Sequence, residues 1–151
     1  MPRAQHYQVV DVYPGEDKSR RARCVDGAIV CCGIFGVFEH TGILVDGHVI
    51  ELAGTGLVRG LSLERFLANR SGDQIYCACD SQAHALTHIG VADTAVQQLY
   101  TFRNYDVVSN NCNRFVADCI TGENRPITTF YELNQVIFTA FHSRVSWLPM
   151  V

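Results

Sequence analysis

The order of apolar and polar residues along the chain predicts short strands first and helices later. Two apolar runs, 40–45 and 48–53, flank Asp46-Gly47, a dipeptide typical of a two-residue hairpin turn. The stretches 14–23 and 54–60 are expected to be loops, the second of them bordering a cleft. Other short apolar runs predict four more strands, at Tyr7–Val12, Gly27–Cys32, Gln74–Cys79 and Tyr105–Val108.

Apolar residues recur at helical spacing in later segments. Ser62 is expected to cap a short helix at 62–67, and longer helices are predicted at 91–102, 113–120 and 129–144. The last helix carries an apolar stripe but almost no basic residues, so we expect it to pack on the domain or against a second copy, as in a homodimer. The alternative is an exposed apolar face for a lipid or a partner. The pattern predicts one α+β domain over residues 1–151, with an antiparallel sheet and helices packed against it.

The amino-acid composition argues against nucleic-acid-binding and membrane-spanning proteins. The chain has 151 residues and a formal net charge of −3, so it lacks the basic surface that a nucleic-acid partner requires. No apolar run approaches the roughly 18 residues of a membrane span, and the first residues form no apolar signal segment. With seven cysteines, an odd number, these features predict a cytoplasmic protein with reduced thiols.

Cys112 is the cysteine best placed for chemistry. It lies in the segment Ser109–Val116, where a polar run gives way to the apolar pair Phe115-Val116. A thiol at a helix N-terminus has a lowered pKa, because the unpaired N–H groups and the helix dipole favour the thiolate. Asn111 and the backbone N–H of Cys112 are candidates for stabilising an oxyanion. On this pattern alone, a buried structural cysteine remains the alternative.

His40 begins the first strand of the hairpin, and Glu51 lies on its partner strand. Pairing across Asp46-Gly47 puts His40 near Glu51, so the carboxylate could orient the imidazole, as the third member of a triad does. The alternative for Glu51 is an outward-facing strand residue. His48 follows the turn at the far end of the hairpin, and His48 and Asn110 are the substitutes if Glu51 does not contact His40.

A metal site is a weaker alternative, and no metal or cofactor is expected. Cys77 and Cys79 share one face of a strand, and His84 and His88 would share a helix face. This spacing is not a usual one for zinc.

Two segments resemble the lecithin:retinol acyltransferase-like family, which includes phospholipase A/acyltransferases and bacterial proteins. Residues 38–52 are similar to its histidine box, and residues 105–122 to its Asn-Cys box. Gly27–Val30 is similar to its opening strand. The resemblance implies a circularly permuted papain-like fold of NlpC type, in which the histidine precedes the cysteine.

The resemblance further implies that Cys112 is a nucleophile and His40 its base. The family's third member is usually a second histidine, and that position falls on Glu51 here. The implied activity is that of an acyltransferase or acyl hydrolase working through a thioacyl-enzyme. Its acyl donor would be a small molecule or a lipid.

Two alternatives stay open. The triplet Asn111-Cys112-Asn113 also resembles the Asn-Cys-Asn box of the PPPDE isopeptidase family, which implies a peptide or protein substrate for a cysteine peptidase or amidase. The third reading is a binding domain that retains the fold without catalysis, as in picornaviral proteins that carry the same two boxes.

Overall fold

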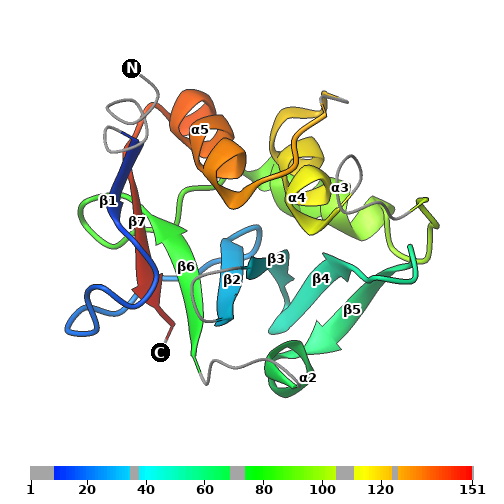
Figure 1. The fold of residues 1–151 in the computed structure, drawn as a ribbon, viewed down its shortest axis with the longest axis horizontal. Coiled ribbons are helices and arrows are strands. Elements are labelled where there is room, and N and C mark those ends of the chain that lie inside the picture. The colour runs from blue at the N-terminus through cyan, green and yellow to red at the C-terminus, as the bar shows by residue number, and fades with distance from the viewer. Residues whose placement is uncertain (1–8, 35–37, 69–73, 105–110, 124–125, 151) are drawn as a thin grey trace.

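The structure, a computed structural model, describes residues 9–34, 38–68, 74–104, 111–123 and 126–150. Within these residues, seven strands form one sheet and four helices pack on it, which is an α+β architecture. Figure 1 shows α3, α4 and α5 gathered on one side of the sheet and the short α2 on the other. The α+β class expected from the sequence is therefore confirmed.

The sheet is mixed, and its order does not follow the chain. From edge to edge the strands run β1-β7-β6-β2-β3-β4-β5, and every neighbouring pair is antiparallel except β1 and β7. The expectation of a purely antiparallel sheet is wrong at this one edge. The strands are β1 (Val10–Val12), β2 (Ile29–Ile34), β3 (Phe38–Val45), β4 (His48–Leu52), β5 (Val58–Ser62), β6 (Ile75–Cys79) and β7 (Val145–Pro149).

The hairpin between β3 and β4 has the predicted turn. Asp46 and Gly47 both adopt positive φ angles, 51° and 72°, as a two-residue turn with the right twist requires. Val45 pairs with His48 directly beside the turn, and Ile43 pairs with Ile50. Local turn chemistry thus sets the register of the two strands that carry the candidate site residues.

The sheet is covered on both faces, so its central strands are apolar on both sides. Cys31 and Ala78 belong to the apolar cluster under α3, α4 and α5, whereas Cys32 and Cys77 belong to the cluster on the opposite face. That second cluster includes Phe66 of α2, which is fully buried. Strands buried on both faces read as continuous apolar runs rather than alternating ones, as Gly27–Cys32 does.

Polar side chains define where the helices begin. The Ser62 hydroxyl accepts the Arg65 N–H, as predicted, and Thr129 with Glu132 forms a reciprocal capping box. In the described residues no helix has the length and apolar character needed to cross a bilayer. The helices are α2 (Leu63–Leu67), α3 (Ile89–Gln97), α4 (Cys112–Thr121) and α5 (Phe130–Phe141).

Two elements differ from the sequence prediction in the middle of the chain. The segment 54–60, expected to be a loop, contains the start of β5, which pairs with β4 along its length. The helix expected at 91–102 instead spans Ile89–Gln97. Tyr100 has a φ of 67°, which a helix cannot contain, and the chain from Tyr100 to Arg103 pairs with the chain beside β5. The predicted strand 105–108 lies outside the described residues.

The end of the chain also differs. The last helix stops at Phe141 because His142 takes a left-handed conformation, with φ at 53°. The next residues form β7, which the sequence pattern did not predict, and Trp147 of β7 is fully buried.

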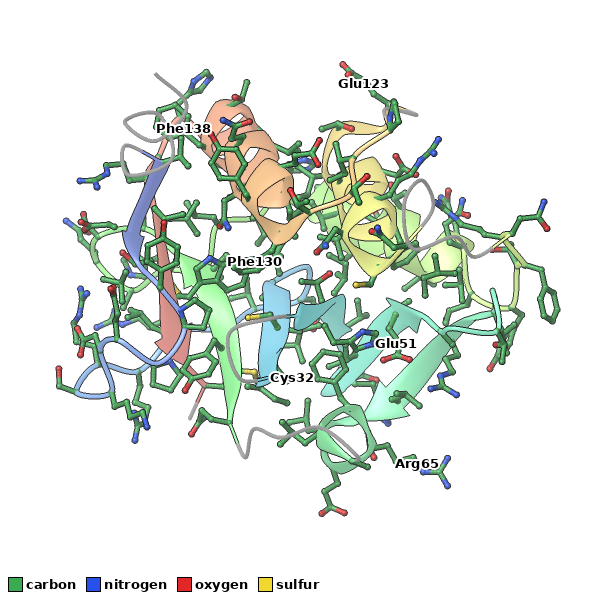
Figure 2. All side chains as sticks on the ribbon, viewed as in Figure 1. Cys32, Glu51, Arg65, Glu123, Phe130 and Phe138 are labelled. Carbon is green, nitrogen blue, oxygen red and sulfur yellow. The ribbon has the colours of Figure 1, made fainter. Side chains whose placement is uncertain are left out.

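The apolar stripe of α5 packs on the domain itself. Leu133, Val136 and Ile137 are buried, whereas Ala140 is exposed, contrary to its place in the predicted stripe. Phe130 of α5, labelled in Figure 2, contacts Trp147 with ring centroids 5.0 Å apart. Of the two arrangements expected for this helix, packing on the domain is confirmed.

Asn134 should be essential to the packing of α5 on β7. It is fully buried, and its Oδ1 accepts the indole N–H of Trp147 at 2.8 Å. In Asn134→Ala the indole N–H loses its partner inside the core, so the free energy of unfolding should fall by about 1–3 kcal/mol. Urea unfolding followed by Trp147 fluorescence measures this, with exposed Thr139→Ala as the matched control on the same helix. Equal stability of the two variants would contradict the prediction.

Candidate active site

A buried carboxylate, Glu51, links strands β3, β4 and β5. The register of β4 and β5 places Arg59 directly across from Glu51, and the hairpin brings His40 onto the same face. Glu51 Oε1 lies 2.7 Å from His40 Nε2, and its Oε2 accepts from Arg59 Nε at 3.0 Å. Glu51 has no exposed surface, and Figure 2 shows it inside the fold, whereas Arg65 extends outward. Both carboxylate oxygens are therefore satisfied by protein groups, as a buried charge requires.

His40 is held on three sides. Its Nε2 faces Glu51, and its ring packs on Phe66 of α2 with centroids 5.3 Å apart. A hydrogen bond also joins its side chain to the thiol of Cys112. Because Nε2 is engaged with Glu51, Nδ1 is the ring nitrogen that meets the sulfur. The imidazole thus bridges a carboxylate and a thiol.

Cys112 is the first residue of α4. Asn111 caps this helix: its side-chain oxygen accepts the N–H groups of Asn113 and Arg114, at 3.0 and 3.2 Å. Cys112 is buried, with 7% of its surface exposed; the Thr41 backbone donates a hydrogen bond to its sulfur, and the Thr41 hydroxyl lies beside it. The helix start and Thr41 together favour negative charge on this sulfur.

The pKa values of the three groups follow from these contacts. Burial lowers the pKa of His40, but its hydrogen bonds and charge interactions with Cys112 and Glu51 outweigh burial and raise it from 6.5 to about 9. Burial raises the pKa of Cys112, yet His40 and Thr41 bring it below its usual range. Burial likewise opposes ionisation of Glu51, while His40 and Arg59 lower its pKa. The site therefore favours a thiolate–imidazolium pair beside a carboxylate.

Thr41 also ties the strand to the helix. Its hydroxyl donates to Asn113 Oδ1 at 3.2 Å, and Asn113 Nδ2 donates to the carbonyl of Thr128 at 3.2 Å. Thr41 and Asn113 are both buried. This chain of bonds runs from β3 through α4 to the segment before α5, and it fixes the position of the Cys112 end of α4 over β3.

Comparison with known protein families matches residues 25–125 to the family described as lecithin retinol acyltransferase. The chain belongs to this family. The matched segment runs from just before β2 to beyond α4, so it contains His40, Glu51 and Cys112. No curated protein and no solved structure gives a significant match.

The structure brings together only some of the residues that the resemblance to lecithin retinol acyltransferases singled out. His40 contacts both Glu51 and Cys112. His48 is exposed beside the turn and hydrogen-bonded to the Asp46 carbonyl. It pairs with Val45, which lies five positions along β3 from His40, so the two histidines are roughly 17 Å apart. Asn110 lies outside the described residues.

Asn111 has a clear structural role at the same site. Its oxygen caps α4, and its Nδ2 donates to the Thr128 carbonyl at 2.9 Å. The oxyanion role expected for Asn111 stays a prediction. The backbone N–H of Cys112, in the first turn of α4, is the other donor that was expected.

Sequence reasoning missed three residues of this lecithin retinol acyltransferase-family site: Arg59, Thr41 and Asn113. Arg59 lies in the segment expected to be a loop, so no strand register was available to place it opposite Glu51. Thr41 and Asn113 adjoin the two candidate catalytic residues in sequence. That adjacency was the signal that could have identified them.

The alternative zinc arrangement is not formed. His88 caps α3 and also contacts the Ile120 carbonyl, while His84 lies beside Arg23. Across the part of the chain that the structure describes, no three His, Cys, Asp or Glu side chains are grouped to hold a metal ion.

Alkylation of Cys112 should begin at lower pH than that of an ordinary thiol. His40 and Thr41 lower its pKa, so the iodoacetamide rate at Cys112 should reach half its maximum below pH 9.0. His40→Ala should move this midpoint upward, because only Thr41 and the helix start then offset the effect of burial on the thiolate. Peptide mass spectrometry after timed labelling at several pH values gives both midpoints. His48→Ala is the matched control and should leave the midpoint unchanged; an equal shift in both variants would contradict the role of His40.

Glu51→Gln should weaken the His40 contact without removing the thiol. A neutral amide cannot balance the imidazolium, so the pKa of His40 should fall and the alkylation midpoint of Cys112 should rise. NMR titration of the His40 ring measures the first change, and the labelling curve measures the second. Exposed Glu64→Gln in α2 is the control with the same change of charge. An unchanged His40 titration in Glu51→Gln would overturn the prediction.

Proposed function

We propose that this member of the lecithin retinol acyltransferase family is a cysteine-dependent acyltransferase or acyl hydrolase with a circularly permuted papain-like fold. The observation that carries the proposal is the contact of Cys112, at the start of α4, with His40, whose other ring nitrogen binds buried Glu51. A nucleophile, a base and a group that orients the base are the three parts that thiol acyl transfer requires.

In the first step, Cys112 attacks the carbonyl carbon of an ester, thioester or amide. His40 holds the thiol proton, so the sulfur attacks as a thiolate and the imidazolium can donate that proton to the leaving group. The negative charge on the carbonyl oxygen would be stabilised by the Cys112 N–H at the start of α4. The product of this step is a thioacyl-enzyme and a protonated leaving group.

In the second step, water or an acceptor alcohol or amine attacks the thioester carbonyl. His40, now neutral, takes a proton from the attacking group, and the thiolate of Cys112 is released. Glu51 keeps the imidazole aligned through both steps, and Arg59 keeps Glu51 ionised when the imidazole is neutral. Family membership favours a lipid-type acyl donor.

Trapping the thioacyl-enzyme tests this function directly. The full chain is mixed with a long-chain acyl thioester, quenched in acid and examined by mass spectrometry. We expect an acyl adduct on Cys112 that hydroxylamine removes, and none in Cys112→Ser. The matched control is Cys119→Ala on the same helix, because burial raises the pKa of Cys119 to about 12 and it should not react.

The outcomes separate the three candidate functions. Cys112 adducts with acyl thioesters support the acyl-transfer function. Adducts only with a ubiquitin-type probe carrying an activated C-terminus would instead support an isopeptidase. A folded protein in which neither probe marks Cys112 would overturn catalysis in favour of a binding domain.

A further inference from the structure

A polar cavity lies between helices α3 and α4, apart from the proposed active site. Its volume is about 440 Å³, within the range of pockets that hold small molecules. Asp118 lies in its wall, six residues along α4 from Cys112 and so roughly 9 Å further along the helix axis. Neither Cys112, His40 nor Glu51 lines it. The hydrogen-bonding and charged residues that line it are Thr94, Gln98, Arg103, Arg114, Asp118 and Glu123.

An ion pair forms one wall of this cavity. Arg103 Nη1 donates to Asp118 Oδ2 at 2.8 Å, and the two side chains are 19% and 16% exposed. The guanidinium also lies over the ring of buried Phe115, 5.3 Å from its centroid. The Arg103 N–H donates to the Gly56 carbonyl, and the Arg103 carbonyl packs so closely on Gly56 that no side chain would fit there. Arg103 is therefore held by both its backbone and its side chain, which lowers the entropic cost of binding a ligand.

The ion pair leaves hydrogen-bonding capacity on both of its members. Asp118 Oδ1 is buried, and no group in the described part of the chain donates to it. A guanidinium has five N–H donors, and the side chain of Arg103 uses one of them on Asp118. Thr94 in α3 and Gln98 at the end of α3 add a hydroxyl and an amide to the same cavity. A buried carboxylate oxygen without a donor is unfavourable, so a ligand that donates to Oδ1 gains binding free energy.

The charges around the cavity favour a ligand that carries both signs. Arg103 and Arg114 are positive, and Asp118 and Glu123 are negative, so their formal charges cancel. A simple anion or a simple cation would bring a charge that nothing in this balanced set neutralises. An α-amino acid carries an ammonium and a carboxylate on one carbon, so its opposite charges are as close together as those of the Arg103–Asp118 pair. It can align head to tail with this pair, and each of its ends then meets the opposite charge.

We propose that the cavity between α3 and α4 binds a free α-amino acid with a polar side chain. The ammonium donates to Asp118 Oδ1, and the carboxylate accepts from N–H groups of Arg103 that the ion pair does not use. The ligand's side chain meets Thr94 and Gln98, which can each donate and accept, so an amide or a hydroxyl fits better than an apolar group. This site goes beyond the proposed acyl transfer and does not depend on it.

An amino acid in this cavity would join two helices. Thr94 belongs to α3, whereas Asp118 belongs to α4, the helix that begins with Cys112. A ligand that contacts both helices binds the folded protein only, because the unfolded chain does not bring these residues together. Binding should therefore raise Tm as the ligand concentration rises.

Titration of the full chain with L-glutamine tests the site. We expect heat of binding by calorimetry and a rise in Tm with L-glutamine concentration. The largest amide NMR shifts should fall on residues that line the cavity. N-acetyl-L-glutamine lacks the ammonium and L-glutaminamide lacks the carboxylate. Each should bind about tenfold or more weakly, because each loses a charge-assisted hydrogen bond.

Substitutions then separate the parts of the site. Asp118→Asn removes the charge that meets the ammonium, so affinity for L-glutamine should fall by about tenfold or more. Thr94→Val exchanges a hydroxyl for a methyl group in a half-buried position and should weaken binding several-fold. Asp93→Asn, exposed on α3 outside the cavity, is the matched control and should bind like the wild type. Cys112→Ser should also bind like the wild type, which separates this site from acyl transfer.

Several results would refute the site. They are the absence of both binding heat and a Tm shift with L-glutamine, equal affinity for N-acetyl-L-glutamine, and NMR shifts centred on His40 and Cys112 rather than on the cavity. Wild-type affinity in a folded Asp118→Asn would equally refute it. Should Asp118→Asn fail to fold, Thr94→Val and the two glutamine derivatives are decisive, because unchanged affinity in these comparisons would remove every proposed contact.

Discussion

The ionised side chain of Glu51 is the constraint around which this end of the molecule is organised. A carboxylate with no exposed surface is costly unless its charge is balanced and its oxygens are bonded, and here a cation and an imidazole meet those needs. Arg59 is partly exposed, so the arginine keeps contact with water while its Nε neutralises the buried charge. The ring orientation of the imidazole is consequently fixed, which is the preorganisation that the proposed thiol catalysis requires.

The remainder of the fold supplies the rigid frame for that arrangement. The hairpin is clamped between β2 and β5, and the start of α4 is bonded to β3 through Thr41 and Asn113. Three strands and one helix thus hold Cys112, His40 and Glu51 from different directions. Sites built on strands and helix ends are held more closely than sites built on loops.

The sequence was informative where the decisive interactions are local. The Asp46-Gly47 turn, the Ser62 cap and the start of α4 each depend on residues within a few positions of one another, and each was predictable. The contact of Glu51 with His40 followed from the hairpin. The permuted papain-like topology and the catalytic roles rest on the family resemblance and remain proposals.

The features that the sequence did not predict depend on pairing between residues that are far apart in the chain. Apolar and polar residues do not alternate regularly along strand β5, which also contains Gly60. Its strand conformation therefore depends on pairing with β4 and could not be predicted from its own residues. Strand β7 follows a helix that the sequence predicts to continue to residue 144, and only residues 142–144, which begin with the left-handed His142, separate the two elements. The contact of Arg59 with Glu51 could not be predicted for the same reason. Without the pairing of β4 and β5, nothing in the sequence places this arginine opposite the carboxylate.

The parallel pairing of β1 with β7 has a consequence for how the chain reaches its native state. Val10 pairs with Val145, so this edge of the sheet forms only after residue 145 has been synthesised. Until then, β6 lacks its neighbour β7, which carries the buried residues Trp147 and Leu148, and the edge of β6 that pairs with β7 stays open to other chains. Contacts of such long sequence separation slow folding. On the ribosome, strands β2 to β6 would thus be available for pairing before β7 is made, and the nascent chain would expose the unpaired edge of β6 until β7 forms.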